Sequence, residues 1–411
     1  MPFRIALSGL NAASTDLEVT GNNIANASTN GFKKSRAEFS DLYANSIQDT
    51  TSSTAGQGAK VAQISQQFTQ GSVDFTSNNL DLAISGEGFF VLEAEDGSVN
   101  YTRAGAYSAD REGYVVNNEA DRLQIYKAEI GVDGGTTFNT GVLEDLQLPV
   151  TPSSPRETTI MSASLNLNST ESVPAIAFDE NNPASYNNAT STTVYDTLGN
   201  PHTSTMYFRK TADNTWENHM FIDGTSVTQA TNPAFTMVFS TSGALTTPAA
   251  GKITLDAHTP TGGAADITLN LDFTGTTQFG ASFGVNNLSQ DGFASGRLSG
   301  VDIDTEGVVF ARYTNGQSAS LGKVALAKFN NQQGLRQIGG SDWAESFQSG
   351  AVQLGEAGTS SFGQIQSGAL EASNVDIAEQ LVNLITAQRS FQANAEVIST
   401  ADTVTQTIIN I

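Results

Sequence analysis

Cysteine is absent from the 411-residue chain, which excludes disulfide bonds, thiolate catalysis and cysteine-ligated zinc. Positive charge is scarce, because 19 Lys and Arg stand against 42 Asp and Glu, and the formal net charge is -23. Binding to nucleic acids or to anionic membranes requires clustered cations. We therefore expect no nucleic-acid partner and no docking on a membrane surface.

Long hydrophobic runs are also missing. No stretch of about 18 apolar residues occurs, and the N-terminus lacks an apolar segment followed by a small-residue cleavage site. We therefore predict no membrane insertion and no cleaved signal peptide. Charged residues make up only 15% of the chain, while Gly, Ser, Thr and Asn are abundant. This composition is typical of secreted bacterial β-proteins rather than of cytosolic enzymes, and the length predicts several domains.

Residues for catalysis or metal binding are few. His202, His219 and His258 are scattered without metal-ligand spacing, and we interpret them as surface or turn residues. The segment "DIDTEG", residues 302–307, resembles the start of an EF-hand loop, but Tyr313 stands where that loop requires a Glu. We interpret it as a hairpin turn. The sequence predicts no catalytic, cofactor or metal site, and hence no enzyme.

What the sequence does contain is a coiled-coil repeat at each end, with apolar residues alternating by four and three positions. The second repeat shifts by three after Ile398, an offset of the stammer type. Ser373 or Asn374 is predicted to cap the C-terminal helix. The apolar positions predicted to carry assembly are Phe3, Leu7, Leu10, Leu17 and Ile24 at the first end and Leu381, Leu384, Phe391, Ile398, Val404 and Ile408 at the second.

These narrow apolar stripes favour pairing of the two terminal helices as a coiled coil, and the alternative is a pair of core helices in a globular domain. A single pair so poor in charge pairs would be marginally stable alone. It would need further helices around it, from neighbouring copies of the chain.

The middle of the chain is predicted to form β-structure. Residues 80–117 contain apolar runs separated by glycine-containing turns, which predicts β-hairpins. A proline-rich stretch at 148–158 and a loop-like stretch at 286–300 mark domain boundaries. The predicted fold is multidomain α+β, with two mainly-β domains of which the outer is inserted into the inner. The predicted parts are a helical core (1–26 and 377–411), a linker region (27–72 and 362–376), an inner β domain (73–148 and 296–361) and an outer β domain (149–295).

Both ends carry recognisable motifs. The segment "SGLNAASTDLEVTGNNIANASTNGFKKSR" resembles the N-terminal motif of the bacterial flagellar rod and hook family, and "SGALEASNVDIAEQLVNLITAQRSFQANAEVISTADTVTQTIINI" resembles its C-terminal motif. We expect "NNIANASTNGF" to end the first helix, since Asn and Ser side chains compete for the backbone. The motif and linker positions are Asn22, Asn23, Asn26, Gly31, Phe32 and Lys33.

Two details of this segment are left as hypotheses. Phe32 is expected to anchor the linker on a neighbouring subunit. The cations of "FKKSR" are interpreted as a solvated loop, with an intersubunit salt bridge as the alternative.

The resemblance implies a structural subunit of the extracellular flagellar hook, which polymerises into a curved, flexible tube. Such a tube acts as a universal joint between rod and filament, and its channel lets later subunits pass. The implied partners are further copies of the chain, the distal rod protein, the hook cap, the hook-filament junction protein, the hook-length control protein and the type III export apparatus. The length and the inserted domain favour hook over rod members; a rod subunit, or a secreted β-rich enzyme or glycan-binding protein, are the alternatives.

Overall fold

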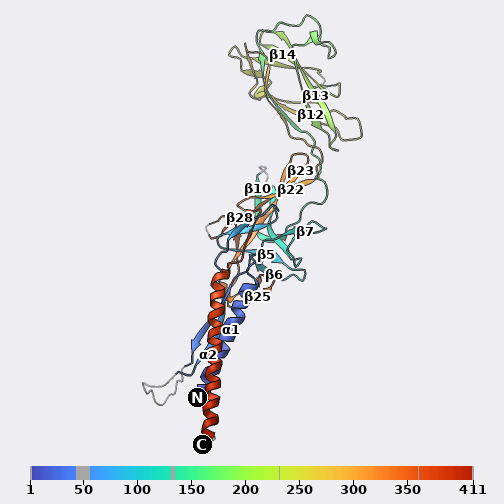
Figure 1. Ribbon diagram of the computed structural model, residues 1–411. Helices are drawn as coiled ribbons and strands as arrows, with labels where there is room; N and C mark the ends of the chain where they lie inside the picture. Colours follow the sequence, from blue (N-terminus) through green and yellow to red (C-terminus); the bar gives the residue numbers. More distant parts are fainter. Residues whose placement is uncertain (1, 43–55, 131–134, 231, 360, 410–411) are drawn as a thin grey trace. The chain divides into compact units, whose positions relative to one another are not determined.

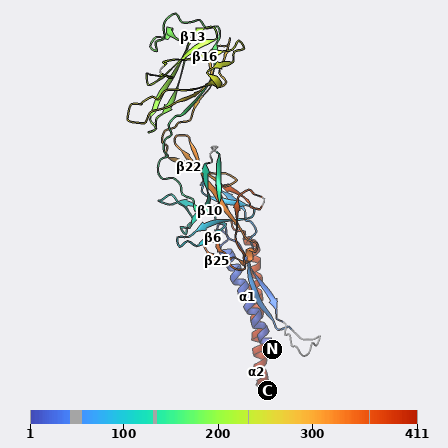
Figure 2. The same ribbon diagram turned by 180° about the vertical axis from the view of Figure 1, so that it is seen from behind.

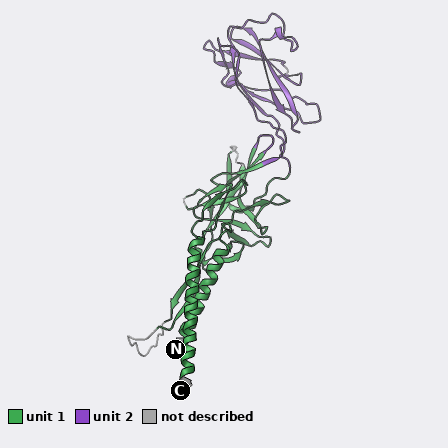
Figure 3. Cartoon of the chain, viewed as in Figure 1, with its two compact units in different colours: residues 1–150, 300–312, 318–411 green, residues 151–299, 313–317 purple. Residues whose placement is uncertain are grey.

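The computed structural model describes residues 2–42, 56–130, 135–230, 232–359 and 361–409. The chain forms two compact units (Figure 3): unit 1 comprises residues 1–150, 300–312 and 318–411, and unit 2 comprises residues 151–299 and 313–317. Both α-helices lie at the ends of the chain and strands fill the described residues between them. The predicted fold class is therefore confirmed.

The terminal helices are α1 (Pro2–Ala25) and α2 (Ile377–Ile409), and they lie side by side and antiparallel, with both chain termini at the same end of the pair (Figures 1 and 2). At 1.5 Å per residue, 24 residues span about 36 Å and 33 residues about 50 Å. The last turns of α2 therefore extend beyond the start of α1. No helix among the described residues is both long and apolar enough to cross a membrane.

The cap of α2 differs from the prediction. Asp376 Oδ1 accepts hydrogen bonds from the backbone amides of Ala378 at 2.8 Å and Glu379 at 3.2 Å. Asp376 is thus the capping residue, where a carboxylate also faces the positive end of the helix dipole. The predicted caps, Ser373 and Asn374, lie before this position, and Asn374 binds the backbone of another segment instead.

Short strand pairs connect the helices to the β-structure of unit 1. A two-stranded ribbon follows α1, and two further pairs join the segment after this ribbon to the segment before α2. The pairs are β1 (Ser35–Asp41) with β2 (Ala59–Gln66), β3 (Val73–Phe75) with β29 (Ala369–Glu371), and β4 (Leu82–Ser85) with β28 (Gln364–Ser367). The two end segments of the chain are therefore held together where α1 has ended and α2 has not yet begun.

The main sheet of unit 1 has the strand order β22-β23-β24-β9-β5-β6-β26-β25, with β7, β8, β10 and β27 pairing beside this path. Its core contains an aromatic cluster in which the rings of Phe68 and Phe89 contact Trp343 edge-on. The strands are β5 (Phe89–Glu93), β6 (Val99–Thr102), β7 (Ser108–Ala109), β8 (Val115–Val116), β9 (Arg122–Ile130), β10 (Thr136–Asp145), β22 (Leu298–Ile303), β23 (Val308–Tyr313), β24 (Ser318–Lys328), β25 (Arg336–Gly339), β26 (Asp342–Ala344) and β27 (Gln353–Glu356). A short 3-10 helix, η3 (Gln332–Gly334), precedes β25.

Unit 2 consists of two sheets that share one hydrophobic core. Alternate residues of β11 (Ile160–Asn168) and β13 (Pro201–Ala212) are buried, as expected for strands with one face on a core. Trp216 is fully buried there. The other elements are η1 (Pro183–Ser185), β12 (Asn188–Tyr195), β14 (Thr215–Ile222), β15 (Thr225–Val227), β16 (Phe235–Phe239), β17 (Leu245–Thr247), η2 (Ala249–Gly251), β18 (Lys252–Thr254), β19 (Asn270–Asp272), β20 (Thr277–Phe279) and β21 (Gly284–Gln290).

The structure tests the predictions for the "DIDTEG" segment and for the histidines. The prediction that "DIDTEG" is a hairpin turn is confirmed, because Asp304 Oδ1 accepts the amides of Glu306 and Val308 between β22 and β23. The interpretation of the histidines is wrong for two of them. His202 and His219 are buried in β13 and β14, and His202 lies between two aspartates.

Candidate assembly site

The two terminal helices meet in regular register. Asn23 Nδ2 donates a hydrogen bond to Gln380 Oε1 at 3.1 Å, and a Cβ atom at Gly9 would lie 2.5 Å from Asn394 Oδ1. From Asn23 to Gly9 is 14 residues along α1, and from Gln380 to Asn394 is 14 residues along α2. Equal steps of two heptads indicate an antiparallel pair without a register slip.

The residues that are buried at heptad spacing along the helix pair are mostly small. Ala6, Ala13 and Thr20 are buried at heptad spacing on α1, and Gln380 and Ala387 are buried at the same spacing on α2. Small residues let helix axes approach, and large residues then lie at the flanks of the contact. The packed stripe of α2 continues to the half-buried residues Ile398 and Ala401 by steps of four and three. The predicted stammer-type offset is therefore wrong for this contact.

The predicted apolar positions divide into two groups. The half-buried ones lie in or beside the packed stripe, and they are Leu10, Leu17, Ile24, Leu384, Phe391 and Ile398. The exposed ones are Phe3 (51%), Leu7 (42%), Leu381 (46%) and Val404 (52%). The side chain of Ile408 lies outside the described residues. The helix pair thus brings together only part of the predicted set, and the role of these residues in assembly stays a prediction.

We use the name outer stripe for the exposed apolar residues of the two helices, which lie on several faces outside the packed contact. Near the chain ends it borders a groove of about 820 Å³ between Phe3 of α1 and Val397 and Val404 of α2. The outer stripe consists of Phe3, Ile5 and Leu7 on α1 and Ile377, Leu381, Val382, Ile385, Val397 and Val404 on α2. Exposed apolar surface concentrated on one element marks an interaction surface, whereas single exposed apolar residues are ordinary.

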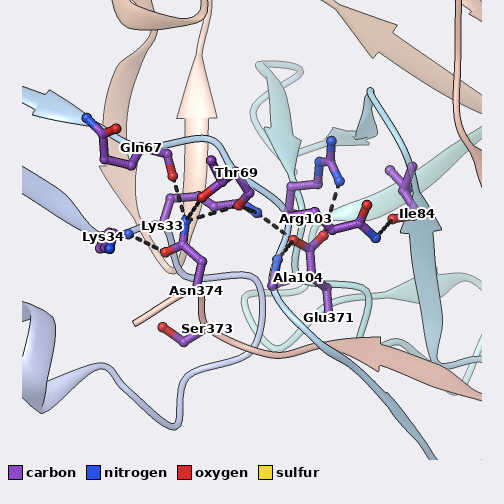
Figure 4. A network of polar contacts seen from close by, with 12 residues as sticks. Lys33, Lys34, Gln67, Thr69, Ile84, Arg103, Ala104, Glu371, Ser373 and Asn374 are labelled. Atoms are coloured by element: carbon purple, nitrogen blue, oxygen red, sulfur yellow. Dashed lines mark hydrogen bonds and ion pairs between the residues drawn. The ribbon is translucent and has the colours of Figure 1, made fainter. Parts of the chain in front are cut away.

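A buried ion network lies where the helices join the β-structure (Figure 4). Glu371, at the end of β29, is fully buried; its Oε1 accepts from Lys33 Nζ at 2.5 Å and its Oε2 from Arg103 Nη1 at 3.1 Å. Lys33 Nζ also donates to the carbonyl of Thr69 at 2.9 Å, and the amide of Gly71 donates to Glu371 Oε1 at 2.9 Å. One carboxylate thus joins the segment after α1, the segment after β2 and the turn after β6 to the segment before α2.

The pKa values of the two cations in this network depend on burial and on the charge of Glu371. Burial lowers the pKa of both Lys33 and Arg103, and the charge of Glu371 opposes that effect. The interpretation of "FKKSR" as a solvated loop is wrong for Lys33, whose side chain is 1% exposed. Lys34 pairs with Glu379 of the same chain at 3.0 Å. Sequence reasoning missed Glu371 and Arg103, because nothing in their local sequence distinguishes them.

The asparagines of the motif act as side-chain partners of the backbone. Asn23 Nδ2 donates to the carbonyl of Ser35 at 2.8 Å, and Asn23 Oδ1 accepts its amide at 2.9 Å, as a neighbouring strand would. Asn26 Nδ2 donates to the carbonyl of Asn22 at 3.0 Å, where α1 ends. Asn374 accepts from the amide of Lys34 and donates to the carbonyls of two residues after β2. These contacts fix the exit of α1 and the entry of α2.

Gly31 and Phe32 complete this junction. Gly31 has a φ of 71°, and a Cβ atom there would lie 2.4 Å from the amide nitrogen of Ala104, so no other residue fits. The amide of Gly31 donates to the carbonyl of Glu371 at 2.8 Å. Phe32 is 6% exposed. The hypothesis that Phe32 anchors on a neighbouring subunit is therefore wrong, since its own chain covers it.

Models of flagellar rod and hook proteins match the chain in four places. "Flagella basal body rod protein" matches residues 3–33, and "Flagellar hook protein FlgE/F/G D1 domain" matches residues 83–153. "Flagellar basal body protein FlaE D2 domain" matches residues 166–293, and "Flagellar basal body rod FlgEFG protein C-terminal" matches residues 366–411. The helix ends and the β-structure between them thus define the class of flagellar axial proteins.

Relatives that match over the full length of the chain identify its family within this class. The chain is 39% identical over 419 residues to the flagellar hook protein FlgE of Escherichia coli (strain K12), with all of both chains covered. It is 34% identical to that of Rhizobium meliloti, covering 100% of this chain and 98% of the relative. The chain belongs to the flagellar hook protein FlgE family. The crystal structure of Helicobacter pylori FlgE2 has the same fold, with a TM-score of 0.52 at 17% identity over 73% of this chain and 100% of that one.

Proposed function

We propose that this chain is the structural subunit of the bacterial flagellar hook. It polymerises with copies of itself into a curved, flexible tube that transmits torque from the rod to the filament as a universal joint. Later flagellar subunits pass through its channel. The observation that carries the proposal is the outer stripe, a set of exposed apolar side chains on helices that belong to a flagellar axial protein.

In this proposal, the permanent and the sliding contacts between subunits are made by different parts of the chain. The terminal helices (1–26 and 377–411) would hold the tube together, because covering the outer stripe gains roughly 25 cal/mol for each Å² of apolar surface. The linker regions (27–72 and 362–376) would set the position of the helices through the network around Glu371. The β-domains (73–148 with 296–361, and 149–295) carry the acidic surface, and wet polar contacts between them would slide when the tube bends.

The remaining assignments rest on the family. The subunit would be exported by the flagellar type III apparatus without a cleaved signal peptide and would act outside the cell. It would meet the distal rod protein, the hook cap, the hook-filament junction protein and the hook-length control protein. A rod subunit of the same class is less well supported, since the relatives over the full length are hook proteins.

Leu381→Asp tests the role of the outer stripe. Leu381 is 46% exposed, so the monomer should tolerate Asp there, whereas an interface that covers this residue should not. We expect soluble, folded monomer that forms no hooks in cells. Phe391→Asp is also expected to abolish assembly, but Phe391 is half-buried against α1 and this variant perturbs the monomer as well.

Thr386→Asp is the matched control for Leu381→Asp. It places the same charge five residues further along α2 at an exposed polar position, and we expect it to permit assembly. Hooks of normal number and length from Leu381→Asp would overturn the assignment of the outer stripe. Loss of hooks in both variants would mean that α2 rejects any added charge, which contradicts a specific role for the apolar residues.

A further inference from the structure

Three carboxylates converge in unit 1, where the turn between β8 and β9 meets the start of β26. Glu119 and Asp121 lie in this turn, Asp342 begins β26, and one oxygen from each lies within 4.8 Å of the others. Asp121 and Asp342 are 6% and 2% exposed, while Glu119 reaches solvent. Carboxylates so close and so buried repel one another unless a proton or a cation lies between them.

The described residues supply no cation to this cluster. None of the ion pairs among them includes Glu119, Asp121 or Asp342, and the neutral amide of Asn100 is the side chain that donates to Asp121, at 3.0 Å. No cationic side chain among the described residues therefore pairs with the cluster.

A second observation is independent of the number of acids. Asp342 is 2% exposed, and its Oδ2 atom has no hydrogen-bond partner among the described residues. Buried polar atoms almost always have partners, so the orphan carboxylate oxygen of Asp342 indicates a bound species that satisfies it.

We propose that Glu119, Asp121 and Asp342 bind a hard divalent cation, Ca²⁺ or Mg²⁺. The donors are all carboxylate oxygens, which these ions prefer, and the cluster holds neither His nor Cys to favour zinc or copper. Oxygens about 2.3–2.6 Å from one Ca²⁺ lie within about 5 Å of each other, which accommodates the observed spacing. Water would complete the shell on the exposed side of Glu119.

The ion would have a structural effect that is separate from polymerisation. It would tie the turn at 117–121 to β26, which pairs with both β6 and β25. The edge of the main sheet would thus be stabilised in media that contain divalent cations. The proposed function can fail without affecting this inference, because the site lies within one unit of a single chain.

Thermal unfolding of the full-length monomer tests the site. CaCl2 or MgCl2 should raise the unfolding temperature of unit 1 saturably, with half-saturation on the order of 0.1–1 mM, the range of many extracellular calcium sites. Unit 1 is followed by the fluorescence of Trp343 in a Trp216→Phe background. NaCl at the same ionic strength should have no comparable effect, since screening alone is not saturable at one site.

Variants decide between an ion and a shared proton. Glu119→Gln, at an exposed position that should not impair folding, and Asp342→Asn are both expected to abolish the response to metal. Asp342→Asn should also be more stable than the parent in metal-free buffer, because it removes repulsion. The control Glu95→Gln, an exposed acid in another turn, should keep the full response. No shift in the parent, or an equal shift in parent and Glu119→Gln, would overturn the proposal.

Discussion

Glu371→Gln is the change that most directly tests how the chain ends are held to the β-structure. The substitution keeps the shape of the side chain and removes its charge. In the parent, Glu371 is fully buried and accepts hydrogen bonds from Lys33, Arg103 and the amide of Gly71. The variant would leave two buried cations facing a neutral amide, whose own N–H groups can only compete with them as donors.

The expected cost follows from the burial of the partners. Lys33 is 1% and Arg103 5% exposed, so water cannot replace the lost carboxylate without opening the junction. Removing one partner from a buried ion pair typically costs about 3–5 kcal/mol, because it leaves an uncompensated buried charge. We expect a loss of that size in the free energy of unfolding of unit 1. Adding Lys33→Met should restore part of it, since one of the two unpaired charges is then removed.

The two tryptophans make this loss measurable in the full-length chain. Trp343 is buried in unit 1, where its Nε1 donates to Gln66 Oε1 at 2.6 Å, and Trp216 is buried in unit 2. Urea unfolding of a Trp216→Phe background reports unit 1, and a Trp343→Phe background reports unit 2. Glu371→Gln should lower the midpoint for unit 1 and leave that for unit 2 unchanged.

Glu379→Gln is the matched control. Glu379 pairs with Lys34 on the surface, where its side chain is 54% exposed, and such pairs contribute at most about 1 kcal/mol. If Glu371→Gln lowers the free energy of unfolding of unit 1 by no more than Glu379→Gln does, the buried network does not stabilise unit 1 as expected. An equal loss of stability in unit 2 would also contradict this role.

Three further predictions concern other parts of the chain. Gly31→Ala should lower the free energy of unfolding of unit 1 by more than the roughly 1–3 kcal/mol of backbone strain, because its Cβ atom also clashes with Ala104. Gly97→Ala is the control, since Gly97 also has a positive φ but has open space around it, and this variant should show the cost of backbone strain alone in urea unfolding. Burial lowers the pKa of His202, but hydrogen bonds that its imidazolium donates to Asp223 and Asp196 outweigh burial and raise this pKa overall. This contribution to the stability of unit 2 is full below about pH 6.5 and is lost as pH rises through the folded-state pKa, and His202→Gln should remove that dependence in urea unfolding. Surface substitutions within residues 160–285 should change the curvature or stiffness of hooks in electron micrographs while assembly continues; failure to assemble would contradict the sliding role.

Much of the fold could be predicted because its signals are local. Steps of four and three placed helices at both ends, and glycine-containing turns between apolar runs placed hairpins in the middle. The turn at Asp304 was predictable because a Tyr stands where a calcium loop requires Glu. Such patterns depend on residues a few positions apart, which a single sequence displays directly.

The rest depends on residues far apart in the sequence. Lys33 looked like part of a solvated loop because its partner, Glu371, lies 338 positions away. The burial of His202 between two aspartates depends on the pairing of β13 with its neighbours. The packed stripe of the helix pair was missed because it uses Ala6, Ala13 and Ala387, whereas apolar periodicity gives weight to larger side chains.

The central claim, that this chain builds the hook, is tested most directly by electron microscopy of basal bodies from a strain that lacks the gene. We expect complete rods that end without hooks in this strain. Hooks should return when the parent gene is restored, but not when the gene for the Leu381→Asp variant is supplied. Rods that stop short would place the subunit in the rod. Intact hooks in the deletion strain would contradict the claim.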